Sequence, residues 1–240
     1  MAVDPATLAG AGPLGSTLAD VAGAAEAAGA SSLWVVEPSG RDGGIDPYPV
    51  LGALATATRT AHLAVLPAGP DRRAPSMAAK IITGVDVLSH GRALLAVGAD
   101  PVGGPEGTAR LEEALAMAGA VLVGEDPTVE GRFWSIRDAV NRPRPVQAGG
   151  VPVVVVVRGV GAERAAVLAV ASGAADGVLV DGGADAVAAA RAAAERAGRP
   201  HVAVLALVAM GQPWPPEADG IVVWWDGTDR TALAGLLAPA

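Results

Sequence analysis

The sequence predicts an α/β fold, and within that class a single (β/α)8 barrel that takes up residues 1–240. The length of 240 residues is close to the ~250 residues typical of such barrels. Apolar residues make up 51% of the chain, which is enough to fill a large core. Short apolar segments of strand length alternate with longer segments of helical periodicity, and no low-complexity linker divides them.

The first half of the chain contains four of the expected strands. The weakest of them, 6–10, precedes a turn rich in glycine and proline. Capping-box spacing from Thr17 starts a helix, which Gly29 ends. Asp46 and Pro47 supply the cap and the first residue of the second helix. The strands expected in this half are 6–10, 33–36, 62–66 and 93–97.

The second half continues the alternation after a helix expected at 110–123 and an excursion at 124–150. Its first strand is a run of five valines, 153–157, which must be buried on both faces, as in a parallel barrel. The strands expected here are 153–157, 177–180, 201–208 and 221–223, and the helices are 162–172, 184–197 and 228–237. The total of eight strands completes the barrel.

Residues 79–98 form the most distinctive stretch of the chain. Apolar residues at helical spacing are followed by a polar turn and then by a continuous apolar run, which predicts helix, turn and buried strand. Gly91 stands where a helix needs a left-handed residue to stop. Arg92 can reach back to the unpaired carbonyl groups at the helix end.

The sequence of this stretch resembles a signature of the bacterial luciferase-like monooxygenase family. The shared residues are Ala79-Lys80, then Asp86, Leu88-Ser89 and Gly91-Arg92, then an apolar strand that ends in Val97-Gly98. Three further stretches fit the same family in the same order: 25–37, 46–51, and 130–134 followed by 142–147. The resemblance implies a TIM barrel that uses FMN or the deazaflavin F420, here with shortened insertions and so with less wall and lid around its pocket.

The resemblance also implies where a cofactor would bind. The family holds the cofactor phosphate on backbone amides after the fifth strand, where this chain has Gly159, Val160 and Gly161. Glycine permits close approach, and the following helix adds its dipole, although an ordinary turn would have the same residues. Arg158 could neutralise the phosphate or lie solvated at the rim. Leu66 and Pro67 occupy the place where the family backs the flavin with a bulge and a cis peptide.

Few acid–base groups are available for catalysis. Glu37 ends the second strand and is the candidate catalytic residue, as a general base or a ring partner, unless it is a loop carboxylate beside Arg41. The coarse pattern places His62, His90 and His201 at the bottom of the barrel, away from the chemistry. Family members that use F420 usually have a histidine or another polar residue where this chain has Pro38, and commonly a histidine where it has Ala74, so the expected catalytic histidines are absent.

Composition excludes several classes of partner and site. A net charge of −8 argues against nucleic acid, and the absence of cysteine removes disulfides and thiolate ligands, so no metal site is expected. The start of the chain has no early Lys or Arg, and no apolar run approaches the ~18 residues of a membrane span, so we expect a cytoplasmic protein without a membrane partner. The resemblance also implies that the protein forms a homodimer, or a hetero-oligomer with a catalytic homologue.

Two functions are compatible with these features. One is a flavin- or F420-dependent oxidoreductase acting on a small organic substrate, in which the cofactor supplies the chemistry. The alanine-rich composition, with Lys80 as the single lysine, indicates a GC-rich genome and slightly favours F420. The other is a non-catalytic homologue that binds a cofactor or a partner, because the barrel fold alone does not decide between them.

Overall fold

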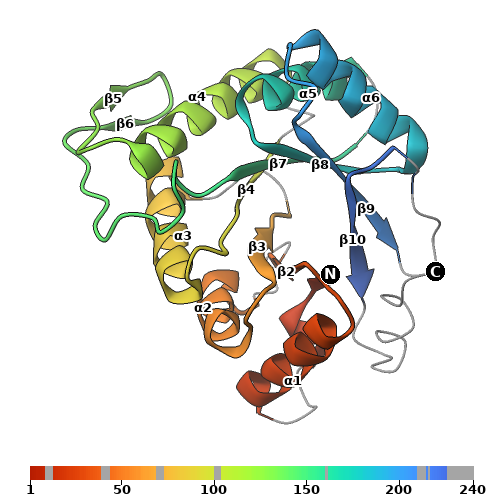
Figure 1. Cartoon of the computed structure of the whole chain (residues 1–240). Helices are drawn as coiled ribbons and strands as arrows, with labels where there is room; N and C mark the ends of the chain where they lie inside the picture. Colours follow the sequence, from red (N-terminus) through yellow and green to blue (C-terminus); the bar gives the residue numbers. More distant parts are fainter. Residues whose placement is uncertain are drawn as a thin grey trace.

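The computed structural model describes residues 1–8, 13–38, 44–68, 73–99, 104–159, 162–209, 215 and 217–225. Eight parallel strands form one sheet in the order β3-β2-β1-β10-β9-β8-β7-β4. The two outermost strands meet through a parallel bridge between Leu63 and Ala93, which closes the sheet into a barrel. Figure 1 shows the helices arranged around the outside of this barrel. The predicted fold class is therefore confirmed.

The strands of the barrel are β1 (Ala2–Val3), β2 (Ser32–Val36), β3 (His62–Leu66), β4 (Leu95–Gly98), β7 (Val153–Val157), β8 (Gly177–Asp181), β9 (Ala203–Ala209) and β10 (Gly220–Trp225). The helices are α1 (Leu14–Ala27), α2 (Pro47–Ala57), α3 (Pro75–Ser89), α4 (Gly104–Val123), α5 (Ala162–Ala174) and α6 (Gly183–Arg196), with a short 3-10 helix at Pro5–Leu8. A hairpin of β5 (Val129–Glu130) and β6 (Ser135–Ile136) lies within the predicted excursion after α4. The helix expected at 228–237 lies outside the described residues.

Side chains that alternate along the strands fill two separate layers. The inner layer fills the barrel and includes Trp34, Leu66, Val156 and Leu179. The outer layer packs the strands against the helices and is the larger of the two. Strand β7 contributes to both layers, and Val155 is fully buried, as the valine run predicted.

Three expected element boundaries were wrong. The first strand is Ala2–Val3, which pairs with both β2 and β10, while part of 6–10 is a 3-10 helix. Helix α1 begins at Leu14 behind Pro13, so Thr17 is buried inside it instead of capping it. Helix α4 begins at Gly104, because a proline in the first turn of a helix is compatible with helical geometry even in a glycine-rich segment.

Acidic side chains bind the backbone at the amino ends of the strands, the bottom of the barrel. Asp176 accepts the N–H of Val153 at 2.8 Å, and Asp219 accepts the N–H of Val204 at 2.7 Å. Each carboxylate satisfies a backbone donor that would otherwise face the end of the barrel unpaired. Glu26 and Asp86 do the same before β3 and β4.

The distinctive stretch 79–98 lies at this bottom end. Asp86 is fully buried and accepts the backbone N–H of Val146 at 2.7 Å and the Nε2 of Gln147 at 2.7 Å. Arg92 reaches back to the carbonyl of Ser89 at 2.8 Å, as predicted, and also to carbonyls at the end of α2. The left-handed stop of the helix is His90 itself, at φ 57°, followed by Gly91 at φ 84°. The stretch that carries the resemblance thus joins α2, α3 and β4 at the bottom of the barrel.

All three histidines lie at this bottom end, as the sequence predicted, and their side chains are exposed. His62 is the first residue of β3, His90 ends α3, and His201 precedes β9. Among the helices of the described residues, none is long and apolar enough to cross a membrane.

Candidate functional site

The carboxyl ends of the eight strands form the mouth of the barrel, where barrel enzymes place their chemistry. On β7, Val154 and Val156 belong to the inner layer, so strand alternation places Arg158 on the same inward face, just beyond the strand. The Nε of Arg158 is buried and has no hydrogen-bond partner within the described part of the chain. A buried guanidinium nitrogen with no acceptor among the described residues is compatible with an anionic group at this end of β7.

A second arginine joins the ends of β7 and β8. Arg164, on α5, is only 8% exposed, and it donates to the carbonyl of Gly159 at 2.5 Å and to that of Asp181 at 2.8 Å. Its Nη1 also lies 3.9 Å from a carboxylate oxygen of Asp181. Arg164 therefore holds the start of the predicted phosphate loop against the neighbouring strand.

The loop predicted to bind the phosphate is described only at its first residue. Gly159 has φ 86°, in the left-handed region that favours glycine. Val160 and Gly161 lie outside the described residues. Helix α5 begins at Ala162, directly after them, so its N-terminal amides are next to the loop. An anion site after β7 requires a helix N-terminus beside the loop, and α5 has its N-terminus there.

Glu37 lies at the end of β2 and is held by two groups from the segment between β3 and α3. Its Oε2 accepts the N–H of Ala68 at 3.3 Å, and its Oε1 lies 3.6 Å from the guanidinium of Arg73. The same arginine pairs with Asp46 and lies 4.9 Å from the centre of the Tyr48 ring. Because Val36 points into the barrel, Glu37 points outward, toward these partners.

The two predicted flavin-backing residues lie at the end of β3. Leu66 is fully buried in the inner layer, and its carbonyl accepts the N–H of Glu37 at 2.9 Å. Within the described residues the cis peptide is Arg142–Pro143, so the bond between Leu66 and Pro67 is trans. The β2 end with Glu37 is separated from the β7 end with Arg158 by β3 and β4, so the structure does not bring these two candidates together.

Sequence reasoning missed Arg164 and Arg73. An arginine in the first turns of an alanine-rich helix is usually solvated, so the sequence contained no signal for the burial of Arg164. Arg73 lies in the proline-rich loop between β3 and α3, and nothing in the sequence of that loop indicates a partner for it. In the described ranges, no group of three or more His, Asp or Glu side chains is placed to hold a metal ion.

Comparison with known proteins relates this geometry to a family. The chain is 34% identical over 159 residues to an F420-dependent glucose-6-phosphate dehydrogenase from Beutenbergia cavernae, a match of 59% of this chain and 47% of the relative. The chain thus spans about half the length of this curated relative.

Solved structures share the fold at low sequence identity. A coenzyme F420-dependent tetrahydromethanopterin reductase from Methanopyrus kandleri superposes with a TM-score of 0.69 at 20% identity, over 87% of this chain and 65% of that chain. The oxygenating constituent of 3,6-diketocamphane monooxygenase from Pseudomonas putida, in complex with FMN, gives 0.64 at 16% identity, over 82% and 62%.

The family described as luciferase-like monooxygenase matches residues 3–213, which is most of the chain. The four sequence stretches noted above all lie within this range. The chain therefore belongs to the luciferase-like monooxygenase family.

Proposed function

We propose that this protein binds F420 at the mouth of the barrel and uses it as an oxidoreductase on a small organic substrate. The observation that carries the proposal is the pair of arginines at the ends of β7 and β8, in a chain whose net charge is −8. Arg158 has a buried nitrogen in need of an acceptor, and Arg164 orders the adjoining loop. The F420-dependent name of the curated relative supports this choice of cofactor over FMN.

The residues present fit an anionic cofactor. Arg158 would pair with its phosphate, the amides after Gly159 would bind the phosphate oxygens, and the N-terminus of α5 would add its positive end. Leu66 would offer an apolar surface to the ring. When bound, the cofactor supplies hydride transfer, so the protein needs only to bind, orient and exclude water.

Glu37 is our candidate for the acid–base group. Its carboxylate is fixed by the N–H of Ala68 and by Arg73, which limits its motion at the rim. In this role it would accept a proton from substrate bound beside β2 and β3.

A second candidate function is a non-catalytic barrel that binds a cofactor or a partner. The specific observation in its favour is that Glu37 points away from the inner layer while all three histidines lie at the bottom. Helix α3 also exposes Met77 and Leu88, each 54% exposed, on its outer side. We propose that this side contacts a second copy of the chain or a catalytic homologue, which mass measurement in solution would test.

Titration of the purified protein with F420, with FMN and with a deazaflavin that lacks the phosphate tests the proposal. We expect F420 to bind tightest, and loss of the phosphate to weaken binding at least about tenfold, or ~1.4 kcal/mol. Equal affinity with and without the phosphate would contradict the arginine site. Binding of F420 without hydride transfer to or from any tested alcohol, aldehyde or sugar phosphate would favour the second candidate.

A further inference from the structure

A cavity of about 90 Å³ lies outside the barrel wall, between β4 and helices α3 and α4. Its lining is mostly apolar: Leu95 and Val97 from β4, Pro75 and Ala78 from α3, and Leu111 and Ala114 from α4. Leu95 and Val97 belong to the outer layer, so the cavity does not open into the inside of the barrel. The residues proposed to hold the cofactor, Arg158, Arg164 and Leu66, do not line it, whereas Arg73, which holds Glu37, does.

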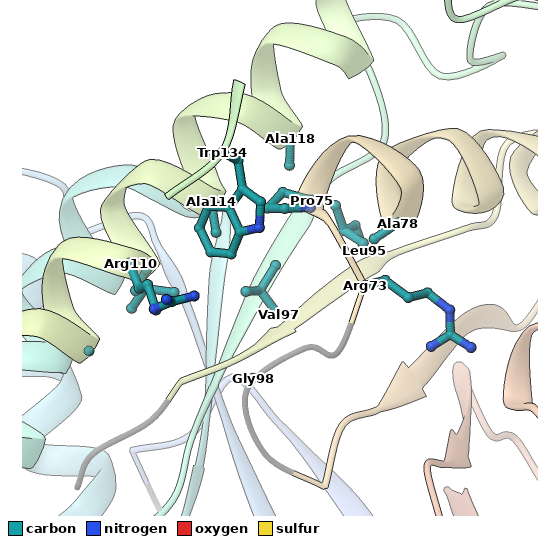
Figure 2. A pocket seen from close by; sticks show the side chains of 12 residues that line it. Arg73, Pro75, Ala78, Leu95, Val97, Gly98, Arg110, Ala114, Ala118 and Trp134 are labelled. Atoms are coloured by element: carbon teal, nitrogen blue, oxygen red, sulfur yellow. The ribbon is translucent and has the colours of Figure 1, made fainter. Parts of the chain in front are cut away.

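A tryptophan from the β5–β6 hairpin closes one side of this cavity. Figure 2 shows the Trp134 ring beside Ala114 and Pro75 and over Val97. The alanines of the lining, Ala78, Ala114 and Ala118, leave the cavity open, because alanine is too small to fill the volume that a larger side chain would occupy.

The hairpin is fixed in place by Glu113 of α4. Its carboxylate accepts the backbone N–H groups of Arg132 at 2.8 Å, Phe133 at 2.9 Å and Trp134 at 2.6 Å. A side chain at Gly131 would begin 2.1 Å from that carboxylate, so any larger residue there would displace Glu113 from the hairpin. Trp134 is thus a fixed wall of the cavity.

A cation lies at the rim. The guanidinium of Arg110 is 4.5 Å from the centre of the Phe133 ring and 5.4 Å from that of Trp134. Glu113 attracts this charge but uses its oxygens on the hairpin amides. Within the described residues, no carboxylate lies within ion-pair distance of Arg110. The other guanidinium of the lining, Arg73, is already paired with Glu37 and Asp46.

We propose that this cavity binds a small aromatic carboxylate of the size of benzoate. The ring would lie against Trp134 and the apolar floor, and the carboxylate would pair with Arg110 at the rim. Protein cavities of ~150 Å³ hold a benzene ring, and the present cavity is smaller but open on one side, which leaves room for the polar end of the ligand. An apolar lining offers few partners to water, so an apolar ring is the favoured occupant.

The test is to titrate the protein with sodium benzoate and, separately, with benzyl alcohol. Calorimetry and the NMR signal of the Trp134 indole monitor each titration. We expect benzoate to bind with a Kd of about 1 mM or tighter and to shift that signal. Ala114→Leu fills the cavity and should abolish binding while leaving F420 affinity unchanged. Ala116→Leu is the matched control, because Ala116 is exposed on the same helix and should leave benzoate binding intact.

A second variant tests the role of the charge. Arg110→Gln should weaken benzoate about tenfold and change benzyl alcohol affinity less than about twofold. The absence of benzoate binding at a benzoate concentration about tenfold above the expected Kd of ~1 mM would overturn the proposal. Binding that survives Ala114→Leu would overturn it too, and so would equal losses for the acid and the alcohol on Arg110→Gln.

Discussion

The carboxylate of Glu26 accepts the backbone N–H of Ala61 at 2.7 Å, and thereby joins helix α1 to the residue that precedes β3. The same group accepts the N–H of Thr60 at 2.7 Å and that of Arg59 at 3.0 Å. Burial raises the pKa of Glu26, but these hydrogen bonds outweigh it and lower the pKa from 4.5 to about 2.

This low pKa predicts an acid-sensitive contribution to stability. Because the folded pKa lies below the unfolded one, the contribution is complete above about pH 4.5 and is lost as the pH falls toward 2. Glu26→Gln should lower the free energy of unfolding by about 1 kcal/mol at pH 7, after allowance for solvent, and by much less at pH 2.5. Urea unfolding at both pH values measures the difference. Glu195→Gln, at an exposed position of α6, is the matched control and should change stability by less than about 0.5 kcal/mol.

Asp86→Ala should destabilise the protein far more. The substitution removes the fully buried carboxylate that accepts the N–H of Val146 and the Nε2 of Gln147, and leaves its place among buried groups empty. We expect a loss of about 3–5 kcal/mol in thermal or urea unfolding. Asp20→Ala, at an exposed position of α1, should change stability by less than about 0.5 kcal/mol. A small effect at Asp86 would show that the junction is not essential to the fold.

Replacing the histidines should leave cofactor-dependent turnover within a few-fold. His62→Gln, His90→Asn and His201→Gln change exposed side chains at the end of the barrel opposite the mouth. Glu37→Gln should lower turnover more than any of them, by the ~10² or more of an acid–base group. Steady-state kinetics with F420 make the comparison. A histidine variant that loses ~10² in kcat would place the chemistry at the wrong end of the barrel for our proposal.

Arg158→Met should separate cofactor binding from stability. Its buried Nε has no partner in the described residues, so we expect unfolding to change little while the Kd for F420 rises about tenfold. Arg196→Met, at an exposed position of α6, should leave both unchanged. A large loss of stability without a change in Kd would instead make Arg158 a structural residue.

Arg164→Met should affect both quantities. Without the guanidinium, the carbonyls of Gly159 and Asp181 lose their donor, which costs about 1–3 kcal/mol of stability. The loop after β7 also loses its anchor, so F420 affinity should fall. Thermal unfolding and F420 titration of the same preparation measure the two effects together.

The sequence predicted strands whose pattern is strong. The five valines of β7 and the Asp46-Pro47 start of α2 are at their expected places, because burial on both faces and capping each leave a local mark. The two-residue strand Ala2–Val3 is too short to show a period, so its place was predicted wrongly. Its position depends on pairing with β2 and β10, which are distant in sequence.

The candidate site was less accessible to sequence reasoning than the fold. The family signature around Asp86 and Arg92 identifies the barrel but lies at the bottom, so it gives no information on the chemistry. The contact between Arg164 and the carbonyl of Gly159 depends on how α5 turns back over β7. The roles of Glu37 and Arg158 are proposals that the variants above test, and those of Leu66 and Pro67 stay predictions.

Among the described residues, one bridge, between Leu63 and Ala93, joins the β3 and β4 sides of the barrel, and we expect the barrel to open first there. The N–H of Leu63 donates to Arg92 at 2.8 Å and the N–H of Leu94 to Leu63 at 2.9 Å, both at the bottom, whereas β7 and β8 pair along four residues. Native-state hydrogen exchange should therefore release the amides of Leu63 and Leu94 before those of Val155 and Leu179. Opening between Leu63 and Ala93 would separate β3 from β4 while the pairing from β4 through β7 and β8 to β9 stays intact. The barrel would then open locally on one side without unfolding as a whole.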